Sequence, residues 1–155
     1  MTSEPFFFIQ LSDPQLGLTA EKKDVSKEEG LAREVAQFES AIAEANRLRP
    51  DFVVVTGDLC HHNLDQVEVA EIKRIAGGLD PAIPIYWTTG NRDSGCDDGV
   101  PIPSMLAKYR QEFGDDYYSF DHKGTTFITI SSTVIFDPSQ TRDEWDAQSE
   151  FIETE

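Results

Sequence analysis

The sequence has 155 residues, in which 13 Lys and Arg face 29 Asp and Glu, so the formal net charge is −16 at pH 7. This length predicts a single domain, residues 1–155. An apolar share of 39% is sufficient for a hydrophobic core, which excludes wholesale disorder. So acidic a chain lacks the clustered Lys and Arg that nucleic acids and anionic membranes require, which excludes both as partners. Multivalent cations are the expected counterpart of its carboxylates.

The cysteines and the N-terminus indicate the compartment. Cys60 and Cys96 are too few for a disulfide scaffold and predict reduced thiols. No segment approaches the roughly 18 consecutive apolar residues of a membrane-spanning helix. The apolar run at residues 6–11 is short and is not preceded by the basic residues that open a signal peptide. The sequence therefore predicts a cytoplasmic protein.

The first half of the chain alternates two apolar patterns. Short apolar runs at residues 6–11, 52–55 and 85–88 predict three strands, the first buried on both faces and the second buried. Between them, apolar residues recur every three or four positions at residues 31–45 and 69–79, which predicts two helices. The order indicates a βαβαβ unit with parallel strands and right-handed crossovers.

The second half predicts different elements. Residues 105–113 indicate a short helix that Gly114 closes. Residues 117–121 and 125–132 predict an antiparallel hairpin around Lys123-Gly124, with His122 on the surface beside the turn. After Pro138 a polar tail carries apolar residues at roughly helical spacing. The fold class is therefore α/β, a parallel βαβαβ unit followed by an antiparallel hairpin.

A cluster of polar residues follows each of the three predicted parallel strands, at residues 13–15, 57–62 and 90–93. Because the carboxyl ends of parallel strands meet at one edge of a sheet, we expect these clusters to converge. Converging carboxylates repel one another, and a bound metal ion relieves that repulsion. Asp, Asn and Gln oxygens suit Mg²⁺, Mn²⁺ or iron. One carboxylate that bridges two ions about 3.5–4 Å apart would make a hydrolytic site.

The sequence motifs formed by these clusters resemble those of the calcineurin-like metallophosphoesterases. The matching residues are Ser12-Asp13-Pro14-Gln15, Gly57-Asp58-Leu59 and Gly90-Asn91-Arg92-Asp93. The family pattern opens with Asp-x-His, continues with Gly-Asp and Gly-Asn-His-Asp or Gly-Asn-His-Glu, and closes with a lone His and Gly-His-x-His.

The resemblance extends over nearly the whole chain. Residues 73–84 and 109–120 are similar to a branch that contains Ser/Thr protein phosphatases and carries Gln in place of the first His. The resemblance implies an αββα sandwich. Residues 1–155 correspond to its N-terminal part, which does not include the closing His motifs. We therefore expect either a truncated sandwich that pairs with a second copy or with a complementing polypeptide, or a fragment of a longer protein.

The resemblance also implies a role for each matching residue. Asp13 and Gln15 would bind a first metal ion, Asp58 would bridge two ions, and Asn91 would bind the second ion and a phosphate oxygen. Asp93 matches the acidic residue that orients the catalytic side chain before it. The implied cofactors are two divalent ions, Mn, Fe, Mg or Zn, and the implied reaction is in-line attack of a metal-bound hydroxide on phosphorus.

Arg92 departs from the family pattern, because the family has its general-acid His at this position. A guanidinium does not release a proton at usable pH, so Arg92 cannot protonate a leaving group. It can bind phosphate and stabilise developing charge. An ion pair with Asp93 or Asp97 is the structural alternative.

The closing His motifs have no counterpart in this sequence. The only histidines are His61, His62 and His122, for which we expect solvated positions. Two carboxylate charges are few for two divalent ions, so we expect weak metal binding and little turnover by this chain alone. Three functions remain open: a metal-dependent phosphoesterase for a phosphorylated small molecule or a phosphoprotein, a non-catalytic relative that binds metal or phosphate, and an α/β interaction module without metal.

Overall fold

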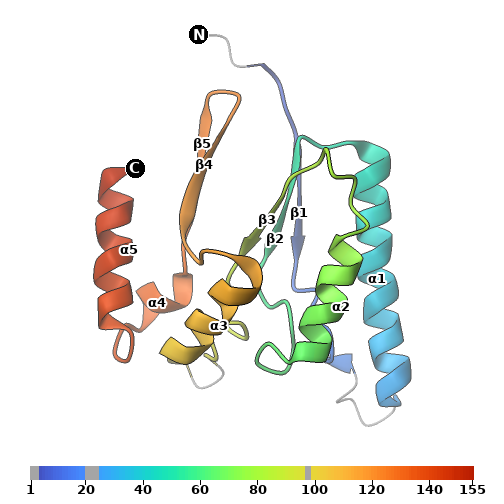
Figure 1. The fold of residues 1–155 in the computed structure, drawn as a ribbon, viewed down its shortest axis with the longest axis horizontal. Coiled ribbons are helices and arrows are strands. Elements are labelled where there is room, and N and C mark those ends of the chain that lie inside the picture. Colours follow the sequence, from blue (N-terminus) through green and yellow to red (C-terminus); the bar gives the residue numbers. More distant parts are fainter. Residues whose placement is uncertain (1–3, 20–24, 97–98) are drawn as a thin grey trace.

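A computed structural model describes residues 4–19, 25–96 and 99–155 and arranges them in four layers (Figure 1). The outer layers are α1 (Lys27–Leu48) with α2 (Gln66–Ala76) on one side and α5 (Arg142–Thr154) on the other. Between them lie a parallel sheet of β1 (Phe8–Ser12), β2 (Phe52–Thr56) and β3 (Ile85–Thr88), and a hairpin of β4 (Tyr118–His122) and β5 (Thr125–Thr129). Helices α3 (Pro103–Phe113) and α4 (Ser132–Phe136) precede and follow the hairpin. The predicted α/β fold, a parallel βαβαβ unit with an antiparallel hairpin, is confirmed.

The parallel sheet has the order β1-β2-β3, so β2 is its central strand. Val53 and Val55 of β2 are fully buried, as predicted. The prediction that the first strand is buried on both faces is wrong, since Phe8 is 41% exposed and alternate β1 residues face outward. Strand β1 is an edge strand, and the hairpin covers only part of its outer face.

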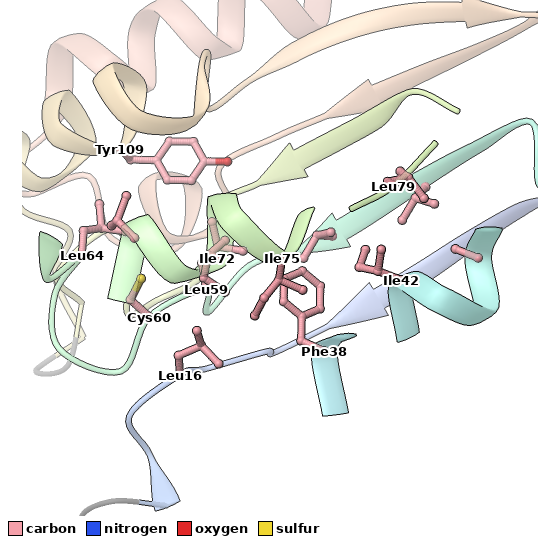
Figure 2. Packing of buried hydrophobic residues seen from close by; sticks show 14 of the residues in the cluster. Leu16, Phe38, Ile42, Leu59, Cys60, Leu64, Ile72, Ile75, Leu79 and Tyr109 are labelled. Atoms are coloured by element: carbon pink, nitrogen blue, oxygen red, sulfur yellow. The ribbon is translucent and has the colours of Figure 1, made fainter. Parts of the chain in front are cut away.

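The main core lies between the sheet and the first two helices (Figure 2). Helix α1 contributes Phe38 and Ile42, and α2 contributes Ile72 and Ile75, at the spacing that predicted each helix. The core continues beneath the loops that follow the strands, where four residues are fully buried: Leu16, Leu59, Cys60 and Leu64. This extension anchors the polar clusters to the core.

Aromatic rings fill the space between the sheet and the hairpin. Phe52 is at the centre, with its ring centroid 5.0 Å from those of Phe8 and Phe127 and 5.3 Å from that of Phe120. Phe120 also stacks on Tyr86 at 3.6 Å. Because Phe120 and Phe127 are cross-strand partners, one face of the hairpin carries both rings onto the sheet.

The hairpin tip is tied to the beginning of β2 by ionic contacts. Asp51 accepts hydrogen bonds from Lys123 Nζ at 2.6 Å and from His122 Nε2 at 2.9 Å. The Lys123 bond is the largest cause that lowers the pKa of Asp51, to about 2. The predicted surface position of His122 holds only in part, because its side chain is 25% exposed and its ring packs edge-on against Phe6 and Phe52.

The last third of the chain differs from the prediction at one element. Residues 130 and 131 leave the hairpin and lead into α4, a five-residue helix that carries no clear periodicity. The helical spacing in the polar tail corresponds to α5, and the Phe151 ring lies 5.3 Å from that of Tyr117. In the described ranges, no helix combines the length and apolar character needed to cross a membrane.

Truncation of Phe52 tests the aromatic layer. Phe52→Ala removes a ring that is 1% exposed, so we expect a loss of about 3–5 kcal/mol in the free energy of unfolding, measured by urea denaturation. Phe136→Ala is the matched control, since that ring is 83% exposed and its loss changes stability by about 0.5 kcal/mol at most. Equal effects of the two substitutions would contradict this packing.

The contact of Asp51 with the hairpin predicts a pH dependence. Because folding lowers the pKa of Asp51 to about 2, its stabilising contribution is present above the unfolded pKa of about 4 and is lost as the pH falls towards 2. Asp51→Asn should therefore lower the thermal midpoint at neutral pH, with the difference from wild type vanishing in acid. Circular dichroism melts across this range check the prediction, and a pH-independent difference would refute it.

Candidate metal centre

The loops after the three parallel strands meet at one edge of the sheet. The strands end in register, with Ser12 opposite Thr56 and Thr56 opposite Thr88. The first two loops then stay side by side, because the Gln15 N–H donates to the Asp58 carbonyl at 2.9 Å. A parallel bridge between Leu16 and Cys60 continues the contact.

The main chain at this edge adopts unusual conformations. Asp13, Gln15 and Asp58 have φ angles of 50°, 40° and 47°, in the left-handed region that residues with side chains rarely adopt. Each such residue costs about 1–3 kcal/mol and persists only where its surroundings impose it. These are three of the four predicted metal ligands, so the strained positions coincide with the residues singled out from the sequence.

Asp58 lies in the tightest part of the site. A Cβ atom on Gly90 would lie 2.2 Å from Asp58 Oδ1, and one on Gly57 would lie 2.6 Å from the Gly90 Cα. Only glycine permits this approach of the second and third loops. The Arg92 N–H donates to Asp58 Oδ1 at 3.0 Å, which fixes the carboxylate against the third loop.

Two negative charges meet at this position. Asp58 is 8% exposed, and its burial raises the pKa of the carboxyl above the usual value. The nearby charge of Asp13 raises it further, whereas the Arg92 N–H lowers it. The Asp13 and Asp58 carboxylates therefore repel one another, and a cation held between them would remove this cost.

Asn91 completes the arrangement from the third loop. One atom of its side-chain amide lies 3.2 and 3.1 Å from the two carboxylate oxygens of Asp58. With nitrogen in this position, the amide donates to both oxygens. With oxygen there, three oxygens face one another without a proton, an arrangement that a cation stabilises. The donor set of carboxylate and amide oxygens thus fits a hard divalent ion such as Mg²⁺ or Mn²⁺.

Asp93 links the second and third loops through hydrogen bonds to the main chain of both. It is fully buried, and its carboxylate accepts the Leu59 N–H at 3.0 Å and the Gly90 N–H at 2.8 Å. Burial is the largest cause that raises the pKa of Asp93, to about 6, and the charge of Asp58 adds to it. Asp93 thus holds the main chain directly after Asp58, at Leu59, and directly before Asn91, at Gly90.

The remaining predicted residues lie at the margin of this cluster. Gln15 is half-buried and contributes its main-chain N–H to the contact with Asp58. Arg92 is half-buried, and its main-chain N–H binds the Asp58 carboxylate. The alternative ion pair of Arg92 with Asp97 involves a residue outside the described part of the chain.

His61 and His62 occupy different environments. His61 is only 5% exposed, so the expected solvated position is wrong for this residue. His62 is exposed, and its Nδ1 lies 2.5 Å from Glu68 Oε1 on α2. Across the residues that the structure describes, no group of three or more His, Cys, Asp and Glu side chains could hold a metal ion. The candidate centre therefore depends on two carboxylates and on amide oxygens.

Comparison with known proteins identifies the family of the chain. The profile of the calcineurin-like phosphoesterase family matches residues 8–150, and the chain belongs to this family of metallophosphoesterases, whose members use divalent metal ions. The serine/threonine-protein phosphatase CPPED1 of Danio rerio is 32% identical to it, over 97% of this chain and 51% of the relative. Those of Bos taurus and Homo sapiens are each 31% identical, over 91% of this chain and 49% of the relative. The chain spans about half the length of these relatives.

Substitution of Asp93 tests how the loops are held. Asp93→Ala leaves two buried N–H groups without an acceptor, at a cost of about 1–3 kcal/mol each in the free energy of unfolding. Asp93→Asn keeps one acceptor oxygen and should lose less stability. Urea denaturation measures both, with Asp143→Ala in the exposed first turn of α5 as the control. The proposed role of Asp93 fails if Asp93→Ala is as stable as the control.

Proposed function

We propose that this chain supplies the metal-binding loops of a phosphoesterase that hydrolyses phosphate monoesters, with phosphoproteins as the substrate class. The single observation that carries the proposal is the convergence of Asp13 and Asn91 on the buried Asp58 carboxylate. Family membership supports the reaction class, and the names of the relatives, serine/threonine-protein phosphatases, support the substrate class.

The residues of the site divide the work in this proposal. Asp13, Gln15 and Asp58 would hold one divalent ion, and Asp58 and Asn91 would hold a second. When bound, divalent ions polarise the phosphoryl group and lower the pKa of water. The Asn91 amide and the Arg92 guanidinium would bind phosphate oxygens, and Asp93 would keep both residues in place through the Gly90 N–H.

Arg92 sets a limit on the reaction. Because a guanidinium cannot protonate the leaving oxygen, this site favours esters whose leaving group is already a stable anion, such as aryl phosphates. Alkyl esters such as phosphoserine need a proton from another group. This observation favours a second candidate function, a relative that binds metal or phosphate without turnover.

The small number of charged ligands bears on affinity and assembly. Two carboxylates leave a divalent ion with several waters, so metal binding by this chain alone should be weak. A second copy of the chain or a complementing polypeptide would supply further ligands. Size-exclusion chromatography with light scattering distinguishes these assemblies from a monomer.

Titration with Mn²⁺ tests the proposed site. We expect wild type to bind Mn²⁺ and Asp58→Asn to bind it at least about tenfold more weakly, measured by calorimetry. Asp143→Asn removes the same charge from an exposed helix position and should leave the affinity unchanged. A wild-type chain that binds no Mn²⁺ refutes the metal site.

An assay with an aryl phosphate then separates the two candidate functions. Turnover that depends on Mn²⁺ and on Asp58 supports the phosphoesterase. Mn²⁺ binding without turnover supports the non-catalytic relative instead.

A further inference from the structure

Glu34 on α1 is a buried carboxylate bound to the loop that carries the first predicted ligands. It is 6% exposed. Its Oε2 accepts the Gly17 N–H at 2.7 Å, and its Oε1 accepts the Thr19 N–H at 2.5 Å. Both carboxylate oxygens are therefore occupied by the main chain just beyond Asp13 and Gln15.

This loop needs support on its α1 side. Asp13 and Gln15 hold left-handed conformations, the contact of Gln15 with Asp58 ties the loop to the chain that follows β2, and Leu16 anchors it in the core. A cavity of about 290 Å³ lies between this loop and α1, with Asp13, Pro14 and Glu34 in its lining. Side-chain packing leaves this space open, and among the residues that the structure describes the Glu34 hydrogen bonds link the loop directly to α1.

The position of Gly17 leaves little freedom for the turn that Glu34 binds. Its φ is 104°, and a Cβ atom there would lie 2.3 Å from Glu68 Oε1. The turn is thus confined between Glu68 of α2 and Glu34 of α1. A displacement of Gly17 would be transmitted along the chain to Gln15 and Asp13.

We propose that Glu34 is a positioning residue for the metal centre: its carboxylate holds the 13–19 loop so that Asp13 and Gln15 face Asp58. This inference rests on the proposed function, because the geometry that Glu34 maintains is that of the predicted ligands. A carboxylate is suited to the task because both oxygens are acceptors, whereas the amide of a glutamine would place an NH₂ group against one N–H donor.

The test compares Glu34→Gln with a control that breaks a similar contact elsewhere. Asp116 is 2% exposed, and its carboxylate accepts the Arg110 Nε at 2.6 Å and the Arg110 Nη2 at 3.1 Å. Asp116→Asn therefore also leaves an N–H donor facing an amide at a buried position. Mn²⁺ affinity is measured by calorimetry at a temperature where circular dichroism shows that both variants are folded.

We expect Glu34→Gln to weaken Mn²⁺ binding about tenfold or more, and Asp116→Asn to leave it unchanged. Hydrogen exchange should become faster at the main-chain amides of residues 15–19 in Glu34→Gln but not in Asp116→Asn. A purely structural role would make the two variants equal in Mn²⁺ affinity. Unchanged Mn²⁺ affinity in Glu34→Gln also overturns the inference.

The exchange measurement also separates this inference from the proposed function. If wild type binds no Mn²⁺, the proposed metal site is refuted and the exchange rates decide the role of Glu34. Faster exchange at residues 15–19 that is confined to Glu34→Gln then supports its hold on the loop. Equal exchange in the two variants refutes it.

Discussion

The close approach of Gly57 and Gly90 is the constraint on which the rest of the site depends. A side chain at either position would collide with main chain or with the Asp58 carboxylate. Because the two loops touch, one buried carboxylate, Asp93, can accept an N–H from each of them. The same contact brings the Arg92 N–H and the Asn91 amide to Asp58. Separating the two loops would therefore move apart Asp58 and Asn91, the predicted metal ligands that follow the second and third strands.

Hydrophobic periodicity predicted the elements because their apolar faces are long enough to be recognised. The βαβαβ unit and the hairpin follow from patterns that repeat over several residues. The Lys123-Gly124 pair marked the turn between the two hairpin strands, and in the structure both residues have left-handed φ angles, 46° and 78°. Two of the differences from the prediction are at positions where distant parts of the chain decide the outcome. His122 is held by Asp51, 71 positions earlier, and the partial exposure of Phe8 follows from its place at the edge of the sheet. A local pattern carries no information about either contact.

In the site, too, some features were predicted from the sequence and others depend on contacts between distant residues. Parallel strands imply a common edge, so the sequence could predict that Asp13, Asp58 and Asn91 belong to one cluster. It could not predict how their loops are held, because Glu34 reaches Gly17 across 17 positions and Asp93 reaches Leu59 across 34. Glu34 is not distinctive at its position, since a glutamate would equally suit an exposed helix face, and Asp93 is singled out by the family motif without any indication of the N–H groups that it binds. Their roles depend on main-chain N–H groups, which are present in every residue and leave no signal in the sequence.

The manner in which the loops are held also explains why the site calls for a cation. Main-chain N–H groups bind Glu34, Asp93 and one oxygen of Asp58, so these carboxylates are oriented largely by dipoles, with the charge of Arg92 adding a smaller contribution at Asp58. Dipoles fix a carboxylate in place but leave the repulsion between neighbouring carboxylates largely uncompensated. Asp13 and Asp58 thus keep their mutual repulsion at the edge of the sheet where the parallel strands end, in a chain whose formal net charge is already −16. In the proposed function, a divalent ion from solution would supply the opposing charge at this edge of the sheet, where carboxylate oxygens lie close together.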